Sequence, residues 1–106
     1  MEYKVYIHPT VYKETIVKLP EKDQLRIKKL TQQLTSNPYV GNILQIKSIR
    51  EKRLNGKRIF YIVFEDLKIV LIVAISDKKT QQKTIDSIRT NMNVYRRYAK
   101  NIGDED

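Results

Sequence analysis

Six basic residues surround a predicted β-hairpin in the second half of the chain. They precede the hairpin, open its first strand or follow its second strand: Arg50, Lys52, Arg53, Arg58, Lys78 and Lys79. Antiparallel pairing would return the second strand beside Arg58, so that Arg58 and Lys78 can share a face with residues 50–53 alongside. Clustered cations can clamp phosphates and stabilise a phosphorane-like transition state, including one formed when an RNA 2′-hydroxyl attacks its own phosphate without a metal. The alternative is that these charges form a solvated face.

Other catalytic chemistries lack the residues that they need. His8 is the only histidine, which excludes a two-histidine metal site and histidine-paired catalysis, and its place between a strand and a proline predicts a structural role. The three glycines form neither a G-x-G-x-x-G motif nor a P-loop. Paired acids would have to come from Glu51, Glu65 or Asp66, and the last two are expected in a turn. We therefore expect neither a metal site nor a cofactor.

The composition narrows the class of partner and the compartment. A chain of 106 residues is one domain of ordinary size. Its 21 Lys and Arg against 12 Asp and Glu give a formal net charge of +9, which indicates a polyanionic partner, either nucleic acid or an acidic protein. The chain has no cysteine, no signal peptide and no apolar run near the roughly 20 residues of a membrane helix. These absences predict a soluble, cytoplasmic protein.

The predicted hairpin organises the fold. Residues 58–64 and 68–75 are rich in β-branched and aromatic side chains, and 65–67 reads as their connection. Asn55-Gly56 predicts a tight turn before the hairpin, preceded by one further strand over 44–54. The unbroken apolar run at 69–73 predicts a strand that is covered on both faces of the sheet.

Flanking segments supply the remaining elements. Alternating residues at 3–7 predict a strand, and two helices should follow, with apolar stripes at Tyr12, Ile16 and Leu19 and then at Ile27, Leu30 and Leu34. The two helices would form a hairpin on one sheet face. Residues 80–102 predict one amphipathic helix, whose stripe either joins the core or docks on a partner. We predict a single α+β domain over 1–102 and a frayed acidic tail at 103–106.

Three stretches resemble the RelE/ParE superfamily of toxins from toxin–antitoxin systems. The stretch KLPEKDQLRIKKLTQQLTSNP is similar to the family's helix ending in Asn-Pro, and NGKRIFYIVFEDLKIVLIVAI to its G-x-R-I-x-Y strand, acidic turn and apolar strand. The stretch SDKKTQQKTIDSIRTNMNVY resembles the Lys-Lys-Thr-Gln segment and final helix of the HigB-like branch. The resemblance implies a RelE-like fold, with an N-terminal strand, a helical hairpin, an antiparallel sheet and a C-terminal helix.

The resemblance also implies roles for the basic residues. The family's ribosome-dependent ribonucleases use an arginine at the start of this strand, which matches Arg58, a basic residue after the apolar strand, and cations on the preceding strand. Members often carry a histidine or tyrosine near the end of the last strand, and residues 76–83 contain neither. The predicted catalytic residues are Arg58 and Lys78, and the predicted RNA-binding residues are Arg50, Lys52, Arg53 and Lys79.

The resulting hypothesis is a toxin that cleaves mRNA at the ribosomal A site and thereby inhibits translation. Its partners would be the ribosome, mRNA and a cognate antitoxin, without a membrane, and both a homodimer and a toxin–antitoxin hetero-oligomer are open. One alternative is a non-enzymatic ParE-like toxin that poisons DNA gyrase on the same fold. Another is a nucleic-acid-binding module without catalysis. Mapping of transcript ends separates the first hypothesis from the gyrase alternative.

Overall fold

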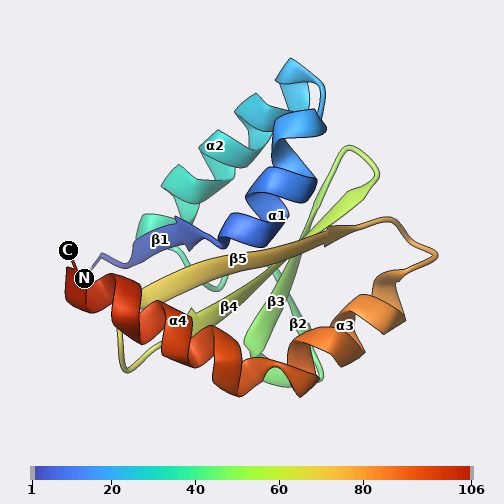
Figure 1. Cartoon of the computed structure of the whole chain (residues 1–106). Helices are drawn as coiled ribbons and strands as arrows, with labels where there is room; N and C mark the ends of the chain where they lie inside the picture. The colour runs from blue at the N-terminus through green and yellow to red at the C-terminus, as the bar shows by residue number, and fades with distance from the viewer. Residues whose placement is uncertain (1, 106) are drawn as a thin grey trace.

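The computed structural model describes residues 2–105 as a five-stranded sheet between two layers of helices (Figure 1). In chain order the strands are β1 (Lys4–Ile7), β2 (Asn42–Leu44), β3 (Ile46–Leu54), β4 (Lys57–Phe64) and β5 (Ile69–Ser76). The helices are α1 (Pro9–Glu14), α2 (Glu21–Ser36), α3 (Gln81–Thr90) and α4 (Met92–Glu105), with a 3₁₀ turn at Ile16–Lys18.

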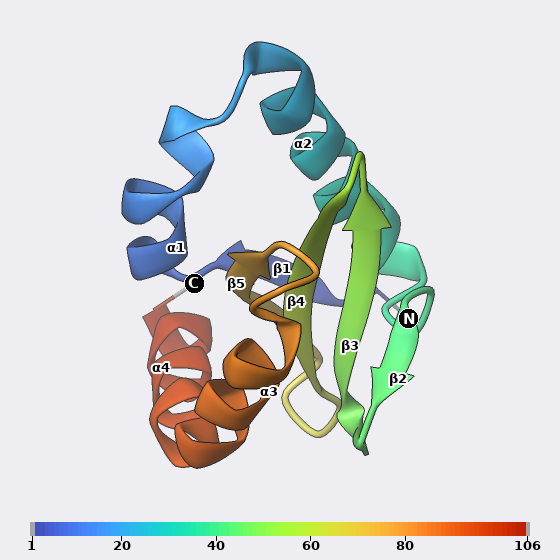
Figure 2. The same cartoon turned by 90° about the vertical axis from the view of Figure 1, so that its right-hand side faces the viewer.

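The sheet has the order β1-β5-β4-β3-β2. Strand β1 lies parallel to β5, and every other neighbouring pair is antiparallel. Helices α1 and α2 cover one face, and α3 and α4 cover the other (Figures 1 and 2). This arrangement confirms the predicted α+β class with a largely antiparallel sheet.

Both predicted turns of the central strands are present. Asn55 and Gly56 have φ angles of 50° and 80°, as a two-residue hairpin turn between β3 and β4 requires. The turn between β4 and β5 is one residue longer than predicted, because Lys68 has a φ of 56° and its N–H donates to the Glu65 carbonyl at 3.2 Å. Strand β5 therefore begins at Ile69 and continues to Ser76.

Alternation along the strands divides the core between two faces. On the hairpin face, which α1 and α2 cover, β4 contributes Ile59, Tyr61 and Val63. On the C-terminal face, which α3 and α4 cover, β4 contributes Phe60, Ile62 and Phe64. Strand β5 is likewise buried on both sides, as its unbroken apolar run predicted.

The helical hairpin is confirmed with one correction to its apolar stripe. Helix α2 buries Ile27, Leu30 and Leu34 on the sheet, as predicted. In α1, however, Tyr12 is 49% exposed, and the neighbouring Val11 packs in the core instead. Helix α1 ends at Glu14, and Ile16 belongs to the separate 3₁₀ turn. Tyr12 and Ile16 therefore do not lie on one face of a continuous α-helix.

Of the segment predicted as one strand over 44–54, residues 46–54 form β3, whereas Leu44 ends a separate short strand, β2, that begins at Asn42. Gln45 has a φ of 58° and reverses the chain, so that Leu44 pairs with Ile46. A short edge strand, β2, is thereby added to β3. This turn contains neither a glycine nor an Asn-Gly pair, so the local sequence does not predict it.

The C-terminal stripe belongs to the core rather than to a partner. Ile85, Ile88 and Ala99 are buried against the sheet, and Met92 and Tyr95 are half-buried beside them. The single predicted helix is divided at Asn91, whose N–H donates to the Ser87 and Ile88 carbonyls at the end of α3. Its own carbonyl accepts from Tyr95 N–H at the start of α4.

The predicted frayed tail requires a correction as well. Helix α4 continues through Glu105, and Asp106 lies outside the described residues. Gly103 allows α4 to pack closely on β5, because a Cβ atom at this position would lie 2.7 Å from Ile69 Cδ1 of β5. Within residues 2–105, no helix is long and apolar enough to cross a membrane.

Candidate functional site

A buried ion pair lies where β4 begins. In the sheet, Arg58 lies opposite Arg53 of β3 on one side and opposite Ser76 of β5 on the other. Its side chain lies on the C-terminal face, in phase with Phe60. The Arg58 Nη1 atom donates to both carboxylate oxygens of Glu51, at 3.2 and 3.1 Å. Glu51 is 2% exposed and Arg58 is 8% exposed, so this pair is largely removed from water.

Two further side chains complete what we call the Glu51 cluster, formed by Glu51, Arg53, Arg58 and Gln81. The amide nitrogen of Gln81 donates to Glu51 Oε1 at 2.6 Å, and Arg53 Nε lies 3.7 Å from Glu51 Oε2. The Arg53 side chain is 65% exposed, so most of its N–H donors face solvent. Two arginines against one glutamate leave the cluster with an excess of one positive charge.

The loop between β5 and α3 brings more positive charge to this end of the sheet (Figure 2). Lys78 and Lys79 are exposed in it. The Asp77 carboxylate accepts from Thr80 N–H at 3.0 Å and from Thr80 Oγ1 at 3.1 Å, and these bonds hold the pKa of Asp77 below its usual value. The predicted return of the second strand beside Arg58 is confirmed by the Arg58–Ser76 register, and it places Lys78 two residues beyond that pair.

The six predicted cations do not share one surface. Arg50 and Lys52 alternate with Glu51 and Arg53, so their side chains lie on the hairpin face. Lys52 borders a groove there with Arg26 and Lys29 of α2. The structure therefore separates Arg50 and Lys52 from the face that carries Arg53 and Arg58.

Arg50 is committed to internal contacts. Its Nη1 atom donates to the carbonyls of Tyr39 and Gly41, at 3.1 and 3.0 Å, and its Nε atom donates to the Lys47 carbonyl at 3.1 Å. The guanidinium also lies over the Tyr39 ring, 4.8 Å from its centroid. At Gly41 a Cβ atom would lie 2.6 Å from the Glu51 carbonyl oxygen, so only glycine allows this close packing. Arg50 holds the segment before β2 against the sheet.

Sequence reasoning missed Glu51 and Gln81 as members of the site. The sequence indicates Glu51 only as a candidate for a pair of catalytic acids, whereas the structure makes it the partner of Arg58. One signal was available, because Glu51 stands two residues after Ile49 and so shares its inward face. Gln81 begins α3 and carried no comparable signal.

The other two candidate acids lie at the opposite end of β4. Tyr39 donates a hydrogen bond to Glu65, and Arg96 binds Asp66. Burial and the hydrogen bond to Glu65 raise the pKa of Tyr39, and the same bond lowers the pKa of Glu65. Among the described residues, no three His, Cys, Asp or Glu side chains are grouped as a metal site.

His8 has the structural role that its sequence context predicts. Its Nδ1 atom accepts from Thr10 N–H at 3.3 Å and caps α1. The ring packs against two tyrosines of α4, with centroids 5.5 Å from Tyr95 and 4.8 Å from Tyr98. Burial lowers the pKa of His8 from its ordinary value. The side chain thereby links the start of α1 to α4.

No protein-family model and no curated protein matches the sequence, but solved structures do match the fold. A mutant of the Escherichia coli toxin RelE in the free state has a TM-score of 0.71 and 15% identity, covering 85% of this chain and 98% of that one. An archaeal RelE–RelB complex from Pyrococcus horikoshii has a TM-score of 0.66 and 23% identity, covering 74% and 97%.

A RelBE toxin–antitoxin complex from Mycobacterium tuberculosis has a TM-score of 0.63 and 20% identity, covering 74% of this chain and 100% of its own. These structures do not distinguish the HigB-like branch, which stays a prediction. At 15–23% identity these similarities concern the fold: the chain has the fold of the RelE toxins.

Proposed function

We propose that this chain is the toxin of a toxin–antitoxin pair and a metal-independent endoribonuclease that cleaves mRNA at the ribosomal A site. The RelE fold supports the toxin assignment, since two of the similar structures are complexes of a toxin with its antitoxin. The net charge of +9 suits polyanionic partners, which include both RNA and an acidic antitoxin.

The Glu51–Arg58 pair is the observation that carries the proposed chemistry. Among the described residues, the hydrogen bonds of the Arg58 guanidinium to Glu51 are both made by Nη1, and in the proposed mechanism its other N–H donors bind the phosphate at the exposed edge of the side chain. When an RNA 2′-hydroxyl attacks the adjacent phosphorus, its proton passes to solvent, the bond to the 5′-oxygen breaks and that oxygen takes a proton from solvent. Negative charge accumulates on the phosphate oxygens during this step. A guanidinium that is already held in position stabilises that charge without reorganising.

Glu51 serves this chemistry by positioning rather than by accepting a proton. Its carboxylate is almost fully buried and already accepts from Arg58 and Gln81, with Arg53 close by. Those contacts fix the orientation of Arg58 across the strands. Lys78, the second predicted catalytic residue, is exposed in the loop after β5 and would act beside Arg58, while the exposed Arg53 and Lys79 would bind the RNA backbone. Arg50 and Lys52 have no place in this set, because they lie on the other face.

Neighbours on β3 provide a matched test of the RNA surface. Arg53→Ala is expected to weaken binding of a short single-stranded RNA and to reduce the slope of log affinity against log salt by about 1. Lys52→Ala removes the same charge one residue away but from the opposite face, and should leave binding unchanged. Fluorescence anisotropy across a salt series measures both. Equal weakening by the two substitutions would show that RNA is not confined to the C-terminal face.

Mapping of transcript ends after induced expression tests the function as a whole. New 5′ ends should appear within translated codons soon after induction, and they should be absent when translation initiation is blocked beforehand. Co-expression of a short acidic protein encoded beside this gene should prevent both cleavage and growth arrest. Growth arrest without new transcript ends would contradict the ribonuclease and favour the gyrase alternative.

A further inference from the structure

A cavity lies on the C-terminal face, outside the Glu51 cluster. It has a volume of about 320 Å³ between β5, α3 and α4. Its apolar base includes Val73 and Ala74 of β5, and its polar side chains include Lys83 and Ser87 of α3 and Tyr95 of α4. Ligand pockets in proteins run from about 300 to 1,000 Å³, so this one suits a single ring system rather than an extended ligand.

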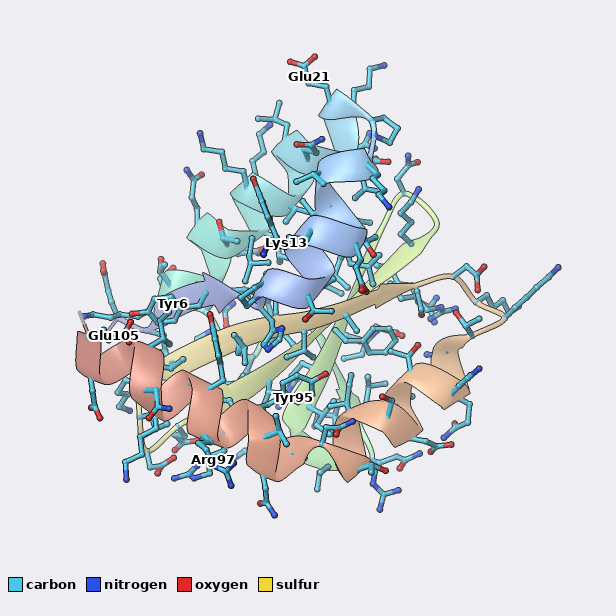
Figure 3. All side chains as sticks on the ribbon, viewed as in Figure 1. Tyr6, Lys13, Glu21, Tyr95, Arg97 and Glu105 are labelled. Carbon is cyan, nitrogen blue, oxygen red and sulfur yellow. The ribbon has the colours of Figure 1, made fainter. Side chains whose placement is uncertain are left out.

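The polar groups of this cavity are available to a ligand. Tyr95 reaches from α4 toward the sheet (Figure 3). Its ring packs edge-on against that of His8, with centroids 5.5 Å apart. Within residues 2–105, its hydroxyl makes no hydrogen bond and Lys83 makes no ion pair. Burial raises the pKa of Tyr95, which keeps the phenol protonated and able both to donate and to accept.

The cavity is adjacent to the Glu51 cluster along the same strands. Ala74 pairs with Phe60, and Ser76, two residues on, pairs with Arg58. Helix α3 contributes to both places, because Gln81 binds Glu51 while Lys83 and Ser87 border the cavity. Two residues of strand span about 7 Å. An RNA strand with its phosphate at Arg58 would therefore bring a neighbouring nucleotide to the cavity.

We propose that this cavity binds the base of the nucleotide next to the cleaved phosphate, and that Lys83 binds the phosphate of that nucleotide. The inference rests on the proposed ribonuclease function. Unstacked bases in RNA sites lie on apolar or aromatic surfaces and are read through hydrogen bonds at their edges. Val73 and Ala74 supply the apolar surface, and the Tyr95 and Ser87 hydroxyls supply the edge contacts. These hydroxyls make the cavity a determinant of base preference.

The test is an NMR titration of the full chain with AMP, GMP, CMP and UMP, each compared with inorganic phosphate. We expect amide shifts confined to residues 73–74, 83–88 and the neighbourhood of Tyr95, with affinities in the millimolar range that differ among the four nucleotides. Tyr95→Phe keeps the ring and removes one hydrogen bond, so it should lower the affinity for the preferred nucleotide by about 3- to 10-fold. Lys83→Gln should lower the affinity for the nucleotide but not for the corresponding nucleoside, which has no phosphate.

Lys100→Gln is the control, since Lys100 lies on α4 outside the cavity. Equal shifts with inorganic phosphate alone, no difference among the nucleotides, or unchanged affinity in Tyr95→Phe would each overturn the proposal. Transcript mapping stands apart from this measurement. If the wild type cleaves mRNA but no nucleotide shifts these residues, the cavity assignment fails while the ribonuclease stands. If nucleotides bind but no transcript is cut, the cavity stands as a nucleotide site and the ribonuclease fails.

Discussion

Replacing Arg58 by alanine is expected to lower the rate of mRNA cleavage by about 100-fold or more, while ribosome binding changes much less. A donor that is aimed at developing phosphate charge lowers the barrier more than it stabilises the bound substrate. In the proposed mechanism Arg58 is such a donor: its bonds to Glu51 hold it in place, and its burial limits its contribution to long-range attraction of RNA. Single-turnover cleavage on programmed ribosomes, beside a binding assay, measures the two effects separately.

Two further variants keep this result interpretable. Arg58→Lys preserves a positive charge beside Glu51, so the fold should persist. The cleavage rate should still fall, because the ammonium group of lysine cannot replace the several N–H donors of the planar guanidinium. Lys57→Ala is the matched control, because Lys57 is the preceding residue of β4 and binds Asp23 on the other face, at 3.5 Å. Cleavage by Arg58→Ala at the wild-type rate, or an equal loss in Lys57→Ala, would show that the site is wrongly assigned.

Removing Glu51 should have the largest effect on stability. Glu51→Ala leaves the buried Arg58 guanidinium without its counter-charge, and breaking such a pair typically lowers the free energy of unfolding by about 3–5 kcal/mol. Gln81 would lose its acceptor as well. Urea denaturation followed by circular dichroism measures the loss through the midpoint of the transition.

A double substitution separates stability from catalysis. Glu51→Leu with Arg58→Met replaces the pair by apolar side chains, which is often neutral or stabilising for a buried ion pair. The double variant should therefore be more stable than Glu51→Ala and yet inactive, and its effect should differ from the sum of the single substitutions because the residues are in contact. If Glu51→Ala were as stable as wild type, the Glu51–Arg58 pair would not be a buried ion pair on which the fold depends.

Local sequence determined the framework of this protein. The Asn55-Gly56 turn was predictable because its positive φ angles suit those two residues. The unbroken apolar run of β5 predicted cover on both faces, and the three-and-four spacing of Ile27, Leu30 and Leu34 predicted the packed face of α2. Each of these signals lies within one element, so no distant partner was needed to read it.

The tertiary structure decided what the charged residues do. Arg53 and Arg58 meet Glu51 on one face, whereas Arg50 and Lys52 lie on the other. The side chain of Gln81 reaches Glu51 from 30 positions away, and the cavity beside this cluster is formed by β5, α3 and α4 together. A charged side chain is catalytic, structural or solvated according to its burial and its partners. Strand register and helix packing set both, and they are properties of the whole fold rather than of any local stretch of sequence.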